Sequence, residues 1–554
     1  MQVQLGEEGE ALQKEQSILE AVAYRDTWGK GTDSYLYMMY ERLTLMRDLL
    51  SERGSIYVHY DWHIGHSIKI LLDEIFIEEH FNNHITWKRS TPRGNAGKKF
   101  PELTDYIFFY SKTYASTWNP QFLMYKEKYI ERYYSYVNDK TERRFQPASL
   151  LGHEGINPIY EWRGLRKPWR YPRHRLEELD LKGLIYWPKE GEIPRLKRFI
   201  DEQKGVPLQS LWDDIPPVNS QAIEDTKFIS QKPEALLERI IKVSSNEGDL
   251  VADFFCGSGT TLAVAEKLGR RWIGVDLGRY AIHTTRKRLI QVQRELHEAK
   301  KPYRSFDVYN LGRYERQWWQ MEKLKGADEE HRKIVLQFYK AAPLSNPPNP
   351  LLHGKKAGAY VHVDQIDSIF SYEELRAAAD AARAAGGREL HCLAWEFEME
   401  LALKKQAVEA ETGLDIRLRY IPREIMEPNR TECQFFEAGY LEAKIVKKGK
   451  KADVELVCFT PALAEAPETE MAELRQRAVK SPFDFIDFWA VDFEWSKGKP
   501  FEHHWQDFRT RKDRSLKIKT DIGWEHKKKG RKNICVKVID VFGVDTTAVI
   551  ETEP

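Results

Sequence analysis

The chain has 554 residues, more than one ordinary hydrophobic core can organise, so about two to four domains are expected. A hydrophobic content of 42% with 12% aromatic residues is typical of a globular protein and excludes a disordered one. The formal net charge of +1 provides no global field, so binding to nucleic acid would depend on local basic patches.

Five cysteines lie far apart along the chain, with no C-x-x-C pair and no spacing of His and Cys typical of a metal site. This pattern predicts reduced thiols and no bound metal. The first residues lack the basic and apolar stretches of a secretory signal, and no apolar run approaches the ~18 residues of a membrane span. The sequence therefore predicts a cytoplasmic protein that makes no contact with a membrane.

The first part of the chain alternates between helix and strand patterns. Residues 1–23 are polar and are expected to be loosely helical. Apolar residues at helical spacing predict a helix over 36–50, and "SIYVHY" (55–60) has the pattern of a buried strand. A helix over 64–76 and strands at "ITWKRS" and "DYIFFYSK" follow, which predicts a mostly parallel α/β sheet.

The rest of the chain shows several changes of pattern. A region rich in Tyr, Trp, Arg and Lys is interpreted as an insertion, and the Pro-rich "SNPPNPLLHGKK" as part of a linker. The expected organisation is a target-binding half over 1–112, an inserted DNA-recognition region over 113–215, a cofactor-binding half over 216–310, a linker over 311–356, a small α/β domain over 357–428 and a β-rich basic domain over 429–554.

The stretch "LVADFFCGSGTTLAVAEKLGRRWIGVDL" (250–277) has the pattern of a cofactor site. A predicted strand ends at Asp253, and Gly257 and Gly259 permit a tight turn that lets the backbone approach a ligand. The helix that follows presents free N–H groups at its first turn. The next strand ends at Asp276, where a carboxylate can accept hydrogen bonds from both hydroxyls of a ribose.

This turn differs from the common phosphate-binding motifs. The third glycine position of G-x-G-x-x-G holds Leu262, and the P-loop pattern is absent, which weakens the dinucleotide and triphosphate interpretations. A short glycine turn with an acid for the ribose fits a nucleoside cofactor without pyrophosphate, such as S-adenosyl-L-methionine. The alternative on spacing alone is a structural βαβ unit with a glycine turn.

Two motifs together resemble the amino-group DNA methyltransferases, which methylate adenine N6 or cytosine N4. "FISQKPEALLERII" (228–241) resembles their "TQKP" motif, and "DFFCGSGTT" resembles their "D-P-F-x-G-[SC]-G-T-T". The order resembles the permuted (beta-type) subgroup, in which the target-binding half precedes the cofactor half. "TDSYLYMMYERLTLMRDLLSERGSIYVHYDW" is similar to type III modification-type adenine methyltransferases, and the resemblance covers roughly residues 24–310.

The resemblance implies a circularly permuted, Rossmann-like, S-adenosylmethionine-dependent methyltransferase fold. The residues implied to bind the cofactor are Gln231, Lys232, Pro233, Asp253, Phe254, Phe255, Cys256, Gly257, Ser258, Gly259, Asp276 and Leu277. Among them, Asp276 would hold the ribose and the Gln-Lys-Pro segment would contact the methionine end. Two departures are visible: Phe254 replaces the usual proline, and Ile229-Ser230 replaces the usual residues before Gln-Lys-Pro.

The family's catalytic motif, [DNS]-P-P-[YF], is missing where the permuted order requires it, so no catalytic residue is assigned. "DIPPV" (214–218) and "NPPNP" (346–350) lie at the wrong positions, and "HYDWH" (59–63) is interpreted as the end of a strand. The missing motif would cap a central strand beside the one ending at Asp253. We therefore expect that the sequence begins after this strand, and that the neighbouring strands have unpaired edges.

Two basic segments are candidates for contact with double-stranded DNA. The candidate residues are Lys88, Arg89, Arg93, Lys98 and Lys99 in the first segment, and Arg163, Arg166, Trp169 and Arg170 in the second. The alternatives are a solvated loop and, for the tryptophans, a structural role. Basic stretches at 509–519 and 526–532 would contact nucleic acid or form a solvated hairpin.

The leading hypothesis is a site-specific DNA adenine N6-methyltransferase of a restriction–modification or defence system, acting by direct transfer to a flipped adenine. Cytosine N4 stays open, whereas cytosine C5 chemistry is disfavoured because the chain has no Pro-Cys pair. The resemblance implies a restriction subunit or a second copy as a partner. The alternative class is a non-catalytic DNA-binding module that supports a partner.

Overall fold

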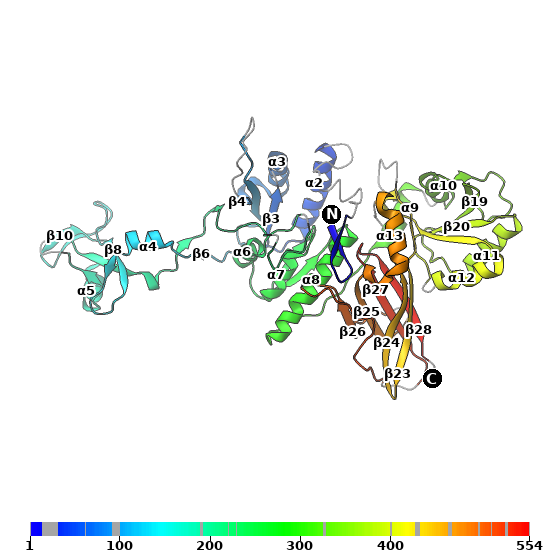
Figure 1. Ribbon diagram of the computed structural model, residues 1–554. Helices are drawn as coiled ribbons and strands as arrows, with labels where there is room; N and C mark the ends of the chain where they lie inside the picture. The colour runs from blue at the N-terminus through cyan, green and yellow to red at the C-terminus, as the bar shows by residue number, and fades with distance from the viewer. Residues whose placement is uncertain are drawn as a thin grey trace.

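The structure is a computed structural model with an extended arm (within residues 122–207) at one end and the helices and strands between residues 312 and 437 at the other (Figure 1). It describes residues 2–13, 32–60, 62–90, 100–188, 192–219, 221–228, 230–324, 328–398, 401–426, 433–463, 468–496, 499–510, 512–526 and 530–552. None of the helices within these ranges is both long and apolar enough to cross a lipid bilayer.

A four-stranded sheet, here called the first sheet, occupies the first part of the chain. Its strands are β3 (Ser55–Tyr60), β4 (Phe81–Lys88), β5 (Thr104–Ser111) and β14 (Leu211–Trp212), in the order β14-β4-β5-β3. The helices are α2 (Thr32–Leu49), α3 (Gly65–Phe76) and the short η1 (Glu78–His80). The helix predicted over 36–50 and the strand predicted over 55–60 are therefore confirmed.

The first sheet is covered on both faces because its strands alternate apolar side chains. Phe108 and Tyr110 of β5 pack against α2 and α3, whereas Ile107 and Phe109 point to the opposite face. That face is covered by α6 (Glu234–Ser244), which packs through Leu236. Side chains on a strand point alternately to the two faces, so one strand can anchor both layers.

The expectation of a mostly parallel first sheet is wrong. β5 runs antiparallel to both of its neighbours, β3 and β4, and only the pairing of β14 with β4 is parallel. β4 and β5 are consecutive strands of the chain and pair directly with each other. Consecutive strands that pair directly are usually antiparallel, whereas a parallel pair needs a crossover connection of a dozen or more residues.

A two-stranded parallel sheet, here called the glycine-turn sheet, follows α6. It consists of β15 (Leu250–Asp253) and β16 (Arg271–Gly274), joined by α7 (Thr260–Lys267) and followed by α8 (Arg279–Glu298). Val251 and Trp272 face α6 and α7. A strand, a helix and a parallel strand form the Rossmann-like α/β unit that the cofactor motif predicts.

Each of the two sheets has an edge strand that pairs on one side only. In the part of the chain that the structure describes, β15 pairs only with β16, and β3 pairs only with β5. The face of the glycine-turn sheet away from α7 is also uncovered, with Leu250, Ile273 and Val275 each 43–53% exposed. Parallel strands are normally covered on both faces, and unpaired edge strands expose backbone N–H and C=O groups. The free edge and the uncovered face of this sheet are therefore typical of strands that lie inside a larger sheet.

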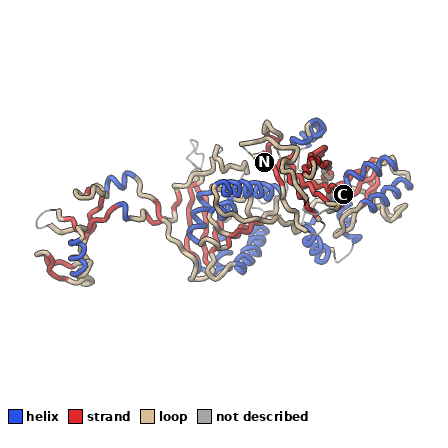
Figure 2. The backbone as a smooth tube through the Cα atoms, turned by 90° about the horizontal axis from the view of Figure 1, so that it is seen from below, coloured by secondary structure: helices blue, strands red, loops and turns tan. Residues whose placement is uncertain are grey.

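The insertion forms an arm that projects from the first sheet in both views (Figures 1 and 2). Its elements are β6 (Phe122–Leu123), α4 (Glu127–Tyr133), β7 (Tyr136–Val137), β8 (Arg144–Ser149), β9 (Ile159–Trp162), β10 (Leu165–Pro168), α5 (Arg173–Leu181), β11 (Ile185–Tyr186), β12 (Arg195–Phe199), η2 (Ile200–Glu202) and β13 (Val206–Pro207). The arm has its own small core around Trp162, Trp169 and Leu176.

An α/β part follows the glycine-turn sheet. Its elements are α9 (Gly312–Lys323), α10 (Asp328–Tyr339), β17 (Ala342–Pro343), β18 (Gly354–Lys356), β19 (Ala359–Val363), α11 (Tyr372–Ala384), β20 (Glu389–Ala394), α12 (Leu401–Thr412), β21 (Asp415–Tyr420), η3 (Arg423–Met426) and β22 (Phe436–Glu437). α11 and α12 cover one face of this sheet, and α9 and α10 cover the other. The interpretation of 311–356 as a linker is therefore wrong, because Trp319 and Val335 of α9 and α10 are buried against the sheet.

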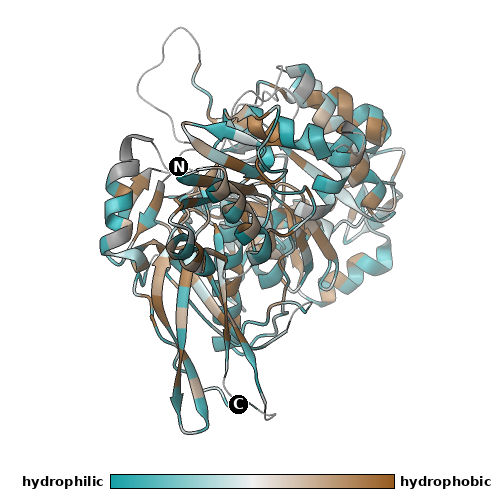
Figure 3. Cartoon of the chain, turned by 90° about the vertical axis from the view of Figure 1, so that its right-hand side faces the viewer, coloured by the Kyte–Doolittle hydropathy of each residue, from teal (hydrophilic) through white to brown (hydrophobic). Residues whose placement is uncertain are grey.

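The C-terminal part is built of long strands, and β24 alternates buried and more exposed residues, whereas the central β25 is buried along most of its length (Figure 3). Its elements are β23 (Tyr440–Lys448), β24 (Lys451–Thr460), α13 (Glu468–Lys480), η4 (Pro482–Phe485), β25 (Ile486–Trp495), β26 (Trp505–Phe508), β27 (Asn533–Asp540) and β28 (Asp545–Glu551). The last four strands form a sheet in the order β26-β25-β27-β28.

The start of the chain packs into the C-terminal part. Residues 2–13 form a hairpin of β1 (Gln2–Leu5) and β2 (Glu10–Gln13), so the loose helix expected there is wrong for these residues. Val3 and Leu5 are buried in the core that β24 and β25 share. Arg514 also donates to the carbonyl oxygens of Gln4 and Gly6. The alternating apolar residues favour a strand once a second apolar surface is available.

Candidate functional site

The glycine turn has the backbone conformation that its sequence predicts. Gly257 has φ of 51° and Gly259 has φ of 71°, both in the left-handed region that favours glycine. A Cβ atom on Gly259 would lie 2.7 Å from Thr285 Cγ2, so a larger residue has no room there. The turn leads directly into α7, whose first N–H groups are presented to a ligand.

Asp276 connects the ends of the two strands. Its Oδ2 accepts the N–H of Gly257 at 2.9 Å, and its Oδ1 accepts the N–H of Gly278 at 2.8 Å. A carboxylate has about four acceptor positions, so it can hold the turn and bind hydroxyl groups of a ligand. Leu277 follows this carboxylate in sequence, and Phe255 lies in the segment between β15 and Gly257; they are 47% and 55% exposed, which suits contact with an aromatic ring of a ligand.

Asp253 fastens the turn to α7. Thr261 Oγ1 donates to Asp253 Oδ2 at 2.5 Å, and the N–H of Phe255 donates to Asp253 Oδ1 at 3.1 Å. Within the turn, Cys256 and Ser258 are buried, and burial raises the pKa of Cys256 to about 12. The Cys256 thiol is therefore protonated at neutral pH and fills space rather than acting as a nucleophile.

The Gln-Lys-Pro segment lies at the start of α6, where Pro233 precedes the first helical residue. The side chain of Gln231 is used within the loop: its Oε1 accepts from Thr226, and its Nε2 donates to the carbonyl of Glu224 at 2.6 Å. The carbonyl of Lys232 accepts from Thr260 Oγ1 at 3.2 Å. These bonds place the segment against the glycine turn, as its motif predicts.

Two residues of α8 complete the turn. Thr285 Oγ1 donates to the carbonyl of Gly257 at 2.9 Å, and Arg288 donates to Thr260 Oγ1 at 2.8 Å and to Glu234 at 2.9 Å. Sequence reasoning misses both residues because they belong to no motif. Their spacing on the buried face of a predicted helix is the signal that could have found them.

A charged cluster centred on the buried Asp105 lies at the carboxyl end of β3. His59 Nε2 lies 2.9 Å from Asp105 Oδ2, and Arg89 Nε lies 2.9 Å from Asp105 Oδ1. Burial alone would raise the pKa of Asp105, but His59 and Arg89 hold it below its usual value. Burial lowers the pKa of His59 and also that of Lys232, whose charge acts on this cluster. Asp61, in the same "HYDWH" segment, lies outside the described residues.

The candidate DNA-binding residues have different surroundings. Lys88, Arg163, Arg166 and Arg170 are exposed, and Arg163 also pairs with Asp180 at 2.7 Å. Arg93, Lys98 and Lys99 lie outside the described residues, and Arg89 is engaged by Asp105.

Trp169 does not lie on the surface of the arm. Its side chain is fully buried, and its indole N–H donates to the carbonyl of Tyr160 at 3.0 Å. The prediction that Trp169 contacts DNA is therefore not supported, because the ring has no surface to offer. Trp169 directly follows β10, pairs with Leu151 and lies with Trp162 in the core of the arm, whereas Arg166 and Arg170 are exposed.

The basic stretches near the C-terminus are partly structural. Arg509 is 3% exposed and donates to the carbonyls of Ile486 and Phe483. Lys517 pairs with Asp521 and Lys532 with Glu494. These cations hold strands and loops together, so they leave less free positive charge than the sequence suggests.

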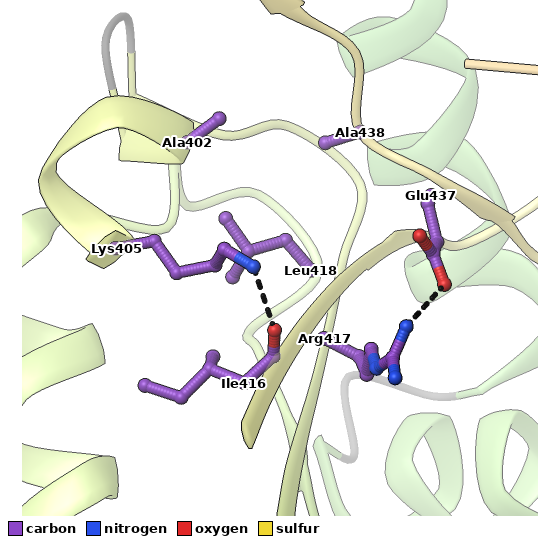
Figure 4. Close-up of a pocket in the computed structure, with 7 residues that line it drawn as sticks. All are labelled: Ala402, Lys405, Ile416, Arg417, Leu418, Glu437 and Ala438. Carbon is purple, nitrogen blue, oxygen red and sulfur yellow. Dashed lines mark hydrogen bonds and ion pairs between the residues drawn. The ribbon is translucent and has the colours of Figure 1, made fainter. Parts of the chain in front are cut away.

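A small hollow of about 60 Å³ lies in the α/β part, far along the chain from the glycine turn. It is lined by residues of α12, β21 and β22, where Lys405 points at the carbonyl of Ile416 and Arg417 at Glu437 (Figure 4). Ligand pockets for nucleoside-sized molecules measure roughly 300 Å³ or more. This hollow holds about two water molecules and is not a cofactor site.

Comparison with known proteins agrees with this geometry. Residues 13–287 match a family model described as DNA methylase. A type II methyltransferase of Enterobacter cloacae, M.EcaI, is 35% identical over 46% of this chain and 57% of its own length. The StyLTI Mod subunit, a type III restriction–modification enzyme of Salmonella typhimurium, is 30% identical over 44% of this chain and 39% of its own length. The chain thus spans about half the length of these curated relatives.

Solved structures with similarity include M1.HpyAVI in complex with SAM, at 18% identity over 46% of this chain and 82% of that chain, with a TM-score of 0.26. A cytosine-N4-specific PvuII DNA methyltransferase is 15% identical over 48% of this chain and 76% of that chain, with a TM-score of 0.23. The match to the DNA methylase family model thus covers about half of the chain, and both the glycine turn and the Gln-Lys-Pro segment lie within the matched residues 13–287.

Proposed function

We propose that the glycine turn binds S-adenosyl-L-methionine. Three observations support the fit: the left-handed glycines, the carboxylate of Asp276 at the end of β16, and the exposed ring of Phe255. Asp276 would accept hydrogen bonds from the ribose hydroxyls, and Lys232 would lie near the methionine end. When bound, the cofactor supplies a methyl group on a positively charged sulfur.

We further propose that the protein is a site-specific DNA adenine N6-methyltransferase of a restriction–modification system. A type II methyltransferase, a type III Mod subunit and a DNA adenine methyltransferase of Escherichia coli K12, YhdJ, are among its relatives, which supports this class. Methyl transfer mainly requires alignment of donor and acceptor, so the residues of the chain would bind, orient and exclude water. A restriction subunit or a second copy would be its partner, in the cytoplasm.

The arm is proposed to bind double-stranded DNA. Arg166 and Arg170 are exposed on and beside β10, and neither position is needed for the core of the arm. Arginine forks onto phosphates and onto guanine edges in the major groove, so an exposed pair on a hairpin suits a groove of DNA. The permuted order, with the first sheet before the glycine-turn sheet, would place the arm beside the target base.

A second candidate, a non-catalytic DNA-binding module, is favoured by two observations. The family's [DNS]-P-P-[YF] motif is missing from the printed sequence at its expected place, and the edges of β3 and β15 are unpaired among the described strands. A strand ending in this motif would pair with both edges and join the two sheets. Under the primary proposal, catalysis requires a strand that ends in this motif, whichever polypeptide segment provides it.

One experiment separates these candidates. The purified protein is incubated with double-stranded DNA of random sequence and methyl-labelled S-adenosyl-L-methionine, and the nucleosides are analysed by mass spectrometry. Labelled N6-methyladenine supports the primary proposal, and labelled N4-methylcytosine replaces adenine by cytosine as its target. Binding of cofactor and DNA without either product supports the second candidate, and failure to bind the cofactor contradicts both proposed uses of the glycine turn.

A further inference from the structure

Helix α8 has two opposite faces, and each contacts a different part of the protein. Thr285 and Leu289 face the glycine turn, where Leu289 packs with Cys256. His283, Lys287 and Ile290 lie on the opposite side and contact the C-terminal part. At 3.6 residues per turn, positions 283, 287 and 290 share one face and positions 285 and 289 lie across the helix from it.

The contact with the C-terminal part centres on Asp487 of β25. Asp487 Oδ2 lies 2.7 Å from His283 Nε2 and 2.7 Å from Lys287 Nζ. The side chains of Asp487 and His283 are only 11% and 4% exposed. Burial alone would raise the pKa of Asp487, but Lys287 and His283 outweigh this, so the carboxylate stays ionised. Burial lowers the pKa of His283, which indicates that the neutral ring donates its Nε2–H to Asp487.

Apolar and backbone contacts extend this interface along α8. Ile290 packs with Phe488 and Phe508 of the C-terminal sheet. At the first turn of the helix, a Cβ atom on Gly543 would lie 3.3 Å from the carbonyl of Arg279, so the two backbones touch. The C-terminal part therefore contacts α8 from its first turn, which is close to Asp276 in the sequence, through at least its third turn.

The opposite face of α8 is hydrogen-bonded to the glycine turn and to the start of α7. Thr285 donates to the carbonyl of Gly257, and Arg288 holds Thr260 at the start of α7. A Cβ on Gly259 would touch Thr285 at 2.7 Å, which shows how closely the helix and the turn approach. A shift of α8 toward the C-terminal part or away from it would move both bonds.

We propose that Asp487 is a positioning residue for the cofactor site, through which the C-terminal part holds α8 against the glycine turn. This inference rests on the proposed binding of S-adenosyl-L-methionine. Without the carboxylate, the partly buried ammonium of Lys287 loses its counter-charge and is drawn toward water. Because Lys287 lies on the same rigid helix as Thr285, the turn would lose its optimal geometry.

The test compares two buried aspartates of β25 in the full-length protein. Asp487→Asn removes the charge that faces α8. The matched control is Asp492→Asn, because Asp492 is 2% exposed but bonds only within the C-terminal part in the described residues, to the N–H groups of Glu494 and Glu502 and to His504. Titration calorimetry measures the Kd for S-adenosyl-L-methionine, and thermal unfolding measures stability.

The expected result is a Kd raised by roughly tenfold in Asp487→Asn and changed less than about twofold in Asp492→Asn, at similar losses of thermal stability. Equal weakening by both variants would overturn the inference, because affinity would then follow general stability. An unchanged Kd in Asp487→Asn would also overturn it. If wild-type protein does not bind the cofactor, the proposed function fails instead, so the two failures are distinguishable.

A second variant keeps the test decisive if Asp487→Asn does not fold. Asp487→Asn combined with Lys287→Met removes both charges and leaves two neutral side chains in their place. We expect it to fold, and hydrogen exchange to show faster exchange of the α8 amides with a weaker Kd. Wild-type affinity together with faster exchange in α8 would contradict the positioning role.

Discussion

Gly259→Ala is expected to damage the glycine turn by two separable effects. The left-handed φ of 71° costs an alanine about 1–2 kcal/mol. In addition, the new methyl group would lie 2.7 Å from Thr285 Cγ2, and such overpacking costs about 1–3 kcal/mol. The sum is about 2–5 kcal/mol of unfolding free energy, and the displaced turn would weaken cofactor binding at least about tenfold.

Gly248→Ala provides the matched control. Gly248 has φ of 85°, but a Cβ there would meet nothing within 4 Å, so only the backbone cost applies. Chemical denaturation should show a loss of about 1–2 kcal/mol, and calorimetry an unchanged Kd for S-adenosyl-L-methionine. Gly259→Ala combined with Thr285→Ala should recover part of the steric share of the stability, because Thr285 Cγ2 and Oγ1 are removed and only its Cβ, at 3.0 Å, remains close. Equal effects of the two single alanine variants on Kd would refute this reasoning.

Three further predictions concern the arm and the C-terminal part. Arg166→Ala and Arg170→Ala should each weaken DNA binding about uniformly across sequences and reduce the slope of log Kd against log salt by about 1; sequence-dependent loss without a change in slope would contradict phosphate contact. Trp169→Ala should cost about 3–5 kcal/mol in chemical denaturation, and a loss below about 1 kcal/mol would contradict its place in the core. Burial raises the pKa of Asp540 to about 7, above the unfolded value, so protonated Asp540 adds stability below pH 4 that is lost as the pH rises to 7. Asp540→Asn should remove up to about 4 kcal/mol of that pH dependence, and an unchanged pH profile of unfolding would contradict it.

The glycine turn was predictable because its geometry is local. The positions of Gly257, Gly259 and Asp276 follow from a strand, a turn and a second strand within 28 residues, and backbone sterics dictate glycine at the two left-handed positions. The helices and strands around it were predictable for the same reason. The hydrophobic spacing of a single segment is sufficient to predict a helix such as α2.

Contacts between distant segments were not predictable from such patterns. The hairpin of residues 2–13 finds its core with β24 and β25, more than 400 residues later in the chain, and nothing in its own sequence indicates that partner. Thr285 and Arg288 form hydrogen bonds with the turn and with α7 only because α8 folds back against them. Aromatic and basic residues are interspersed in the arm, and the sequence alone does not say which of them point inward. The surroundings of Trp169 were therefore ambiguous, because a shift of one residue in a strand exchanges the two faces.

Binding of S-adenosyl-L-methionine by wild type and by Asp276→Asn tests the central claim most directly. The account predicts one binding site in the wild-type protein, measured by titration calorimetry. Asp276→Asn should bind roughly 10- to 100-fold more weakly, because the neutral amide loses charge-assisted hydrogen bonds to the ribose. Equal affinities of the two proteins, or no binding by the wild type, would contradict the assignment of this turn as the cofactor site.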